Sequence, residues 1–310
     1  MESDRILSDL LNALKAPLNV LGALLCLVIV ELGGCAVDVE KSIYNLSDKV
    51  DESSGIVASR THGGVFWTHE DNGLSNNLYA VDAKGDFLFK TDVAGSKNVD
   101  WEDITIDDDG YLYIADVGNN DNERKDLLVY KVREPDPTDP TSTATVAKRI
   151  RFRYPTQTGF PAPNDLNYDA EALFFADGTL YILTKNRSET TTDLYSFPTL
   201  DADVEIELAH EATFELGYDL LNEGGKVTGA DISPDGSTLA MLCYDAIYLF
   251  PRPSGDGHWL STSPQKVALD QSVTKQAEGI AFYEDHLVLT NEEGEFHHLR
   301  SALSGASSYP

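Results

Sequence analysis

Five oxygen-bearing side chains stand at matching places in five similar stretches of this sequence. They are Ser54, Glu102, Glu171, Thr228 and Glu278, separated by steps of 48, 69, 57 and 50 residues. Three carboxylates brought together would repel one another unless a cation compensated them. Calcium, which takes about six to eight oxygen ligands at about 2.3–2.6 Å, suits such a set, whereas zinc prefers nitrogen and sulfur ligands. The alternative is that each side chain caps a strand.

The five residues each open an apolar stretch that leads through a turn into a second apolar stretch. In the clearest copy a strand begins at Glu102, a turn covers 107–110 and a second strand covers 111–115. Alternating aliphatic and aromatic residues between Gly, Asp and Asn turns are typical of strands. A strand–turn–strand repeat of about 50 residues indicates a β-propeller, in which the first strand of every blade lines a central channel. We count five copies and predict five blades; six blades are the alternative.

The segments at the two ends of the repeats predict how the propeller closes. The pattern of Ser42–Leu46 predicts a strand, while the last repeat has no fourth strand pattern after Leu299. An N-terminal strand that completes the last blade would remove the exposed sheet edges. Elsewhere, the pattern of Glu205–Leu208 predicts a strand, and only Ala209–Asn222 could form a short helix.

The N-terminus has the features of an export signal. Leu18–Val30 is an apolar run of thirteen residues, interrupted only by Asn19, which is short for a membrane span and suits a signal peptide. It leads into Leu32–Cys35, which resembles a bacterial lipobox, the motif that ends in a lipidated cysteine. We therefore expect an exported protein anchored through a lipid at Cys35, in the periplasm or at the cell surface. The alternative is an uncleaved membrane anchor.

These features divide the chain into three parts. Residues 1–34 are the expected signal peptide, 35–50 a tether with the closing strand, and 51–305 a single propeller domain. Cys243 is the only cysteine in that domain, so no disulfide forms within it, and its apolar neighbours predict a buried thiol.

The charge of the chain excludes one class of partner. The net charge is −29, from 23 basic and 52 acidic residues. Such a chain repels nucleic acid, whereas it suits a cation-binding protein or a solvated acidic surface. We expect a monomer that binds a small molecule or a peptide.

The five oxygen-bearing residues carry a family resemblance. Ser54, Glu102, Glu171, Thr228 and Glu278 resemble the central ring of the calcium-dependent apyrases, five-bladed propellers whose calcium is held by serines and glutamates at the starts of the inner strands. The resemblance implies that these five residues hold calcium. Through 100–104, 115–120 and 169–173 the chain also resembles exported bacterial propellers of unassigned function.

Polar residues after the second strand of each repeat predict a ligand site at the channel mouth. The candidates are Asp71, Asp116, Asn119, Asn120, Lys185 and Arg187. The basic residues come from one repeat only, so the mouth is acidic and disfavours a triphosphate. We therefore place a ligand-binding or scaffold module first. A calcium-dependent hydrolase, acting on a phosphoester, a nucleotide or a lactone-type ester, is the alternative, with His69 as a candidate base.

Overall fold

The computed structural model describes residues 40–300, apart from positions 51, 72, 74, 202 and 218–222. These residues form an all-β structure with one short helix, α3 (Gln271–Thr274), and two 3₁₀ turns, η1 (Glu223–Gly225) and η2 (Trp259–Ser261). Among the residues described, no helix has the length and apolar character needed to cross a membrane. The expected signal peptide and Cys35 lie outside the described part.

Most strands pair antiparallel in groups of four. The first group is β2 (Ser53–Ala58), β3 (Val65–Glu70), β4 (Asn77–Asp82) and β5 (Phe87–Ala94). The second is β6 (Trp101–Ile106), β7 (Tyr111–Asp116), β8 (Leu128–Arg133) and β9 (Ala144–Arg153). The third is β10 (Ala170–Ala176), β11 (Thr179–Thr184), β12 (Thr191–Ser196) and β14 (Ala209–Glu215). The fourth is β15 (Val227–Ile232), β16 (Thr238–Cys243), β17 (Ala246–Pro251) and β18 (Gln265–Ala268).

The last group confirms the predicted closure by an N-terminal strand. It contains β19 (Ala277–Tyr283), β20 (His286–Asn291) and β21 (Glu295–Arg300), and β1 (Glu40–Asn45) pairs antiparallel with β21. The strand begins two residues before the predicted one. Ser42 lies opposite His298, and the Tyr44 ring packs edge-on against the His298 ring with centroids 5.4 Å apart. The closing strand thus covers the edge that β21 would otherwise expose.

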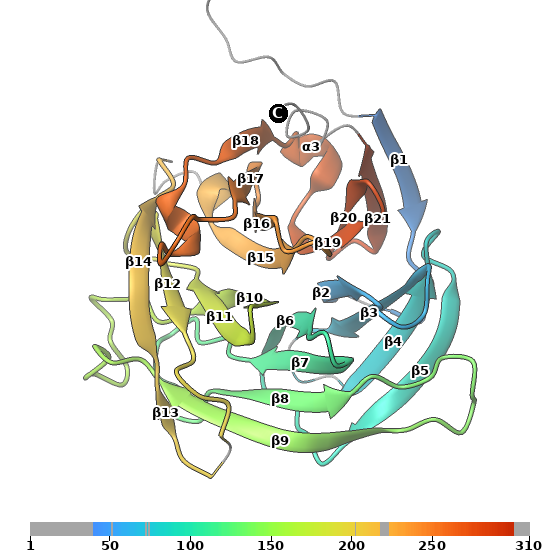
Figure 1. Ribbon diagram of the computed structural model, residues 1–310, viewed down its shortest axis with the longest axis horizontal. Coiled ribbons are helices and arrows are strands. Elements are labelled where there is room, and N and C mark those ends of the chain that lie inside the picture. Colours follow the sequence, from blue (N-terminus) through green and yellow to red (C-terminus); the bar gives the residue numbers. More distant parts are fainter. Residues whose placement is uncertain are drawn as a thin grey trace, which may run out of the picture. The chain divides into compact units, whose positions relative to one another are not determined.

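The sheets are arranged around a common axis (Figure 1). The innermost strands contact one another in a closed circuit: β2 with β6, β6 with β10, β10 with β15, β15 with β19, and β19 with β2. Apolar side chains fill the space between neighbouring sheets; Ile150, Phe152 and Leu173, for example, pack between the second and third groups. Sheets packed in this way around one axis form a β-propeller. The repeat therefore predicts the fold class correctly.

Two details of the third group differ from the sequence prediction. The expected helix over Ala209–Asn222 is wrong for 209–215, which form β14, because the partly buried Ala212 and Phe214 alternate with more exposed residues and pack against the core. The strand expected over 205–208 is also reassigned. It contains β13 (Ile206–Glu207), which pairs in parallel with β9 of the neighbouring group, so β14 takes the outer place instead.

Candidate metal centre

Every innermost strand carries an irregularity at the position that the repeat picks out. In β6, Trp101 pairs with Asp116 and Asp103 pairs with Ala115, so Glu102 has no partner on β7. The same shift occurs at Glu171, Thr228 and Glu278, and in β2 a similar shift spans Ser54 and Gly55. A β-bulge redirects a side chain and is common beside functional sites. The repeated oxygen-bearing residue is thus the bulged residue of each innermost strand.

Four of the five bulged residues line one cavity of about 230 Å³. These are Ser54, Glu102, Glu171 and Glu278. Thr228 is not part of this lining, and its Oγ1 donates to the Ala277 carbonyl at 2.7 Å. Ser54 Oγ donates to the Glu102 carbonyl at 2.8 Å. Both hydroxyls therefore join neighbouring innermost strands, and the expectation that all five side chains face one site is not met for Thr228.

The carboxyl groups around the cavity form two sets that share Glu102. Asp71, Asp100 and Glu102 make up the first set, and Glu102, Asp169 and Glu171 make up the second. Within each set one oxygen from every residue lies within 4.8 Å of the others. Two oxygens that are each about 2.4 Å from one calcium ion lie at most about 4.8 Å apart, so either set is compact enough to share an ion.

Sequence reasoning missed Asp100 and Asp169. Each precedes a bulged glutamate by two positions, as Asp100-Trp-Glu102 and Asp169-Ala-Glu171. Because this Asp-x-Glu spacing occurs in two repeats, it was a usable signal for paired carboxylates. The corresponding positions in the other repeats hold Glu52, Lys226 and Gln276, which hides the pattern when single positions are compared.

The first set depends on the absence of a side chain at Gly118, in the loop after β7. A Cβ built at this position would collide with Glu102 Oε1 and Asp100 Oδ2. Arg124 holds the loop in place, because it donates to the Gly118 carbonyl at 2.9 Å and to Asp116 Oδ1 at 2.9 Å. The loop therefore forms a cradle for the two carboxylates, and the residues present fit an oxygen-liganded cation.

Gly118→Ala is expected to weaken calcium binding at least about tenfold, equivalent to about 1.4 kcal/mol, because the new methyl group displaces both carboxylates. Isothermal titration with calcium measures the change. Gly63→Ala is the matched control, since a Cβ at Gly63 meets no atom within 4 Å. Equal affinity in the two variants would contradict the assignment of the cradle.

Two cationic side chains neutralise much of the second set. Lys185 Nζ lies 3.0 Å from Glu171 Oε1, and an Arg187 amino group lies 2.7 Å from Asp169 Oδ2. Lys185 also donates to the Tyr244 hydroxyl at 3.1 Å, and that hydroxyl donates to Glu278 Oε1 at 2.8 Å. Internal counter-ions thus occupy this side of the cavity, which makes the first set the better candidate for a bound cation.

Burial makes the charges of the cavity costly. Burial, followed by repulsion from neighbouring carboxylates, holds the pKa of Glu102 well above its usual range and raises the pKa of Asp100 to about 7. Burial also raises the pKa of Glu278 to about 8, against the opposing charge of Lys185. Burial alone would lower the pKa of Lys185, but Glu171 and Glu278 raise it well above its usual range. A cation entering this cavity would relieve the repulsion.

Removing the internal counter-ions is expected to create a second cation site. In the double variant Lys185→Met, Arg187→Gln, the set of Glu102, Asp169 and Glu171 loses the ion pairs that compensate it. The calcium stoichiometry measured by isothermal titration should then rise from one to two. Arg252→Gln, which removes an exposed ion pair with Asp177, is the control and should leave it at one. An unchanged stoichiometry in the double variant would contradict the claim that Lys185 and Arg187 keep the second set from binding calcium.

The residues predicted at the channel mouth divide into two kinds. Asp71, Asn120, Lys185 and Arg187 line the cavity. Asp116 and Asn119 do not. Asp116 is buried against Arg124, and the Asn119 side-chain amide donates to the Tyr168 carbonyl at 3.0 Å. These two residues shape the loop that carries Gly118.

His69 does not lie at the mouth. Its side chain is fully buried, with its ring edge-on to Trp101 at a centroid distance of 5.6 Å. Burial lowers the pKa of His69 to about 4, although the backbone carbonyls of Glu70 and Asp103 oppose the shift. The imidazole is therefore neutral near pH 7 and outside the cavity, so it is unsuited to act as the predicted base.

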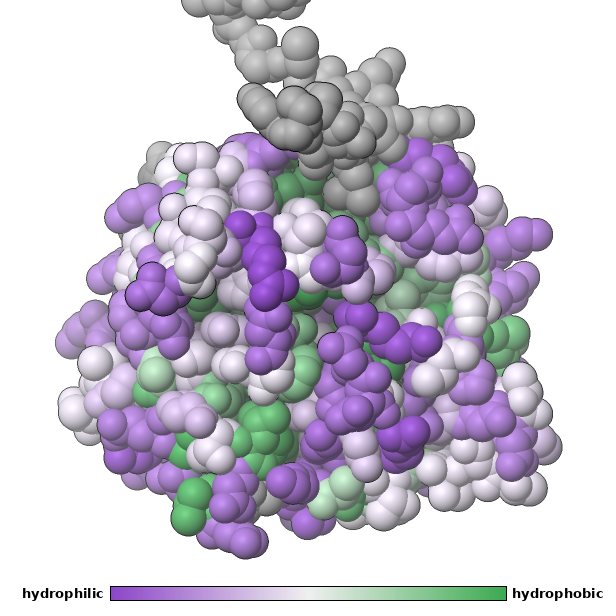
Figure 2. Space-filling view, viewed as in Figure 1, coloured by the Kyte–Doolittle hydropathy of each residue, from purple (hydrophilic) through white to green (hydrophobic). Residues whose placement is uncertain are grey.

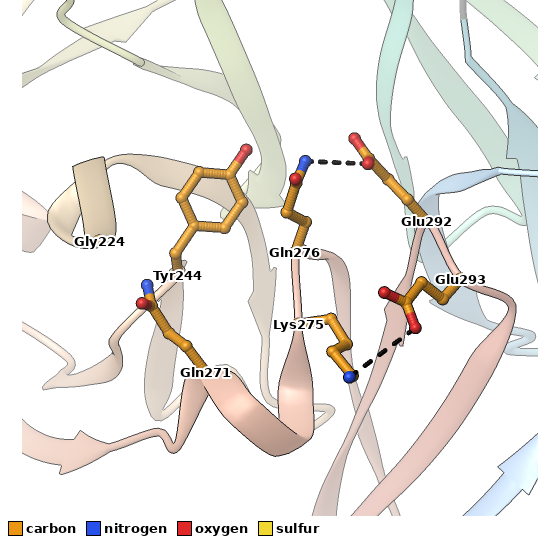
Figure 3. A pocket seen from close by; sticks show the side chains of 7 residues that line it. All are labelled: Gly224, Tyr244, Gln271, Lys275, Gln276, Glu292 and Glu293. Atoms are coloured by element: carbon orange, nitrogen blue, oxygen red, sulfur yellow. Dashed lines mark hydrogen bonds and ion pairs between the residues drawn. The ribbon is translucent and has the colours of Figure 1, made fainter. Parts of the chain in front are cut away.

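A second cavity of about 460 Å³ adjoins the first (Figure 3). Tyr244 and Glu292 line both cavities. Figure 3 shows Tyr244 and Gln271 on one side and Glu292 on the other, with Gln276 donating to Glu292 Oε2 at 2.8 Å. Amides, carboxylates and one aromatic ring offer both donors and acceptors to a polar ligand.

The surface is polar beyond these cavities. On the face drawn in Figure 2, hydrophilic side chains predominate and hydrophobic ones form smaller patches. This agrees with the acidic composition of the chain.

No protein-family model matches the chain, and no curated protein matches it. Solved structures that resemble it include virginiamycin B lyase from Staphylococcus aureus, with 14% identity over 83% of this chain and 68% of that one, at a TM-score of 0.40. A putative gluconolactonase shows 15% identity over 87% and 94% of the two chains, at 0.44. The β-propeller domain of Cps50 (Swd1) from Myceliophteria thermophila shows 12% over 83% and 99%, at 0.41. Similarity at this level concerns the fold alone.

Proposed function

We propose that this chain is a five-bladed β-propeller that binds calcium in its central cavity and serves as a ligand-binding or scaffold module of the bacterial cell envelope. The blade count is supported by five groups of four strands and by five innermost strands in one circuit. Within the residues described, no group of strands remains for a sixth blade.

The observation that carries the calcium proposal is the set of Asp71, Asp100 and Glu102, in which Glu102 is buried and the two aspartates are partly buried, accommodated by Gly118. The cavity lining contains seven carboxyl groups and two cationic groups, so it keeps an excess of negative charge. Carboxylates, hydroxyls and carbonyls are the ligands that calcium prefers. Asp71, Asp100 and Glu102 would hold the ion, which would tie the first two blades together.

The ligand site of such a module is the cavity in Figure 3. Because Tyr244 and Glu292 line both cavities, a polar ligand seated there would lie beside the cation site. Calcium titration of the wild type and of Tyr244→Ala separates the ligand site from the calcium site. This variant should keep its affinity for calcium through the first set, whereas Asp100→Asn should bind calcium more weakly. Loss of calcium binding in Tyr244→Ala alone would contradict the separation.

A calcium-dependent hydrolase is the second candidate. It is favoured by the Tyr244 hydroxyl and the Lys185 ammonium, which share the cavity with the carboxylates. Burial raises the pKa of Tyr244, so this hydroxyl would remain protonated and donate a proton rather than accept one. A panel of phosphoesters, nucleotides and lactones, assayed with calcium and with chelator, distinguishes the candidates. Calcium-dependent turnover that Tyr244→Phe reduces would favour the hydrolase, and no turnover would favour the binding module.

We also propose that the protein is exported and anchored by a lipid on Cys35. The support is the apolar run that ends in Leu32–Cys35. In cells grown with radioactive palmitate, the protein should be labelled, and Cys35→Ala should abolish the label and release the protein from membranes. Cys26→Ala, within the apolar run, is the matched control and should remain labelled. Labelling that survives in Cys35→Ala would contradict the anchor.

A further inference from the structure

Among the residues described, other strands pair with the outer edge of β9 only at its two ends. Its first residues, Ala144 and Thr145, pair in parallel with β5, and its last, Phe152 and Arg153, pair in parallel with β13. Figure 1 shows β9 along the outside of the molecule. Over 146–151, none of the described strands pairs with this edge. The interval is about 20 Å long, and a groove of about 330 Å³ lies along it.

The backbone of this interval points toward the open side at two residues. The Phe152 N–H donates to the Leu127 carbonyl, so the backbone of Phe152 faces the neighbouring strand β8. Hydrogen-bonding direction alternates along a strand, so Ile150 also faces β8 whereas Arg149 and Arg151 face outward. Arg153, the next residue in this alternation, confirms the outward direction, because its carbonyl accepts from the Leu208 N–H at 3.1 Å.

The open interval is also a concentration of positive charge in an acidic protein. Lys148, Arg149 and Arg151 lie within it and Arg153 follows it, so four of the 23 basic residues fall within six positions, and all four side chains are exposed. Arg153 is paired with Glu205 and Glu207, and Arg149 donates to the Gly95 carbonyl. Arg151 has no hydrogen bond or ion pair with any other residue described.

We propose that the open interval of β9 binds an acidic peptide segment, added as an extended strand. Both strands that already pair with this edge, β5 and β13, run parallel to β9. A peptide strand bound between them would therefore also run parallel to β9. Main-chain hydrogen bonds would give affinity and carboxylates facing Arg149 and Arg151 would give specificity. Repulsion between like charges disfavours pairing of this edge with the same edge of a second copy. The inference is independent of the calcium site.

The test uses a fluorescein-labelled hexapeptide of alternating glutamate and threonine, with blocked ends, and fluorescence anisotropy on the full-length protein. Binding should occur, weaken as salt is raised because the charges are exposed, and fall at least about tenfold in Arg151→Glu. Lys84→Glu, at another exposed lysine, is the matched control and should leave binding unchanged. Arg151→Gln gives the same test with a smaller change, should the charge reversal disturb folding.

A peptide of the same sequence with N-methyl groups on alternate backbone nitrogens separates strand addition from simple charge attraction. It keeps every carboxylate but loses hydrogen-bond donors, so its binding should also fall at least about tenfold. Equal binding of the methylated peptide, or no binding of the unmodified one, would overturn the proposal. Binding to phosphatidylglycerol vesicles without binding to the peptide would overturn it in favour of a lipid surface.

Discussion

Glu102→Gln is expected to weaken calcium binding at least about 100-fold, equivalent to about 2.7 kcal/mol, which is the largest change in affinity from any single substitution. Glu102 is the one carboxylate common to both sets around the cavity, so its loss leaves neither set complete. Isothermal titration with calcium measures the effect. Glu134→Gln, whose carboxylate bonds Thr61 and Trp67 away from the cavity, is the control and should retain wild-type affinity. Equal affinities of the two variants would contradict the role of Glu102.

The same substitution is expected to stabilise the calcium-free protein at neutral and alkaline pH. A carboxyl group whose pKa is raised in the folded state contributes stability that is complete below its unfolded pKa and is lost as the pH rises through the folded value. For Asp100 this loss runs from about pH 3.8 to about pH 7, and for Glu102 it continues to higher pH. In chelator at pH 8, Glu102→Gln should therefore melt above the wild type. A lower melting temperature would contradict the cost assigned to this buried charge.

Asp103→Ala is expected to lower the free energy of unfolding by about 3–5 kcal/mol, because it leaves buried backbone N–H groups unpaired. Asp103 Oδ2 accepts from the Leu173 N–H at 2.7 Å and from the Ala230 N–H at 3.3 Å, while Oδ1 accepts from the Ile104 N–H at 2.8 Å. One carboxylate thus joins the innermost strands β6, β10 and β15. Urea denaturation measures the change.

Asp108→Ala is the control for this prediction. The Asp108 side chain is 92% exposed and forms only a distant pair with Arg60, so its removal should change stability by less than about 0.5 kcal/mol. Asp103→Ala should also keep a calcium-induced rise in melting temperature, because its carboxylate is in neither set. Equal stability of the two variants would contradict the assigned role of Asp103.

The contrast between Glu102 and Asp103 shows how far sequence reasoning reaches. Glu102 is found from the repeat, because a strand–turn–strand unit and its first residue are local patterns. Asp103 is not, although a signal exists. The residue after the bulge is Gly55, Ala172, Gly229 or Gly279 in the other repeats, so Asp103 is the only large side chain at this position. The difference between the repeats comes from tertiary packing. Gly55 packs directly against the Asp103 backbone, so a side chain at position 55 would collide with it.

Other features depend on contacts that no local pattern contains. The bulges that redirect the five residues arise from pairing with the next strand. The Lys185–Glu171 ion pair joins a residue of β10 to the residue that follows β11. The sequence of β14 suggests a helix because four of its seven residues are alanine or glutamate, which favour helices. Packing of Phe214 against Tyr248 and Phe250 decides its conformation. The short parallel pairs of β9 are likewise set by neighbouring blades.

The central claim is that the native protein binds one calcium ion through Asp71, Asp100 and Glu102. The most direct measurement is the melting temperature of the purified protein in excess chelator and at a calcium concentration about 100-fold above the dissociation constant, together with elemental analysis. Binding to the native state alone would add about 2.7 kcal/mol, or about 5–10 °C. The account predicts this rise, one calcium per chain, and the loss of both in Glu102→Gln. An unchanged melting temperature with no bound metal would contradict it.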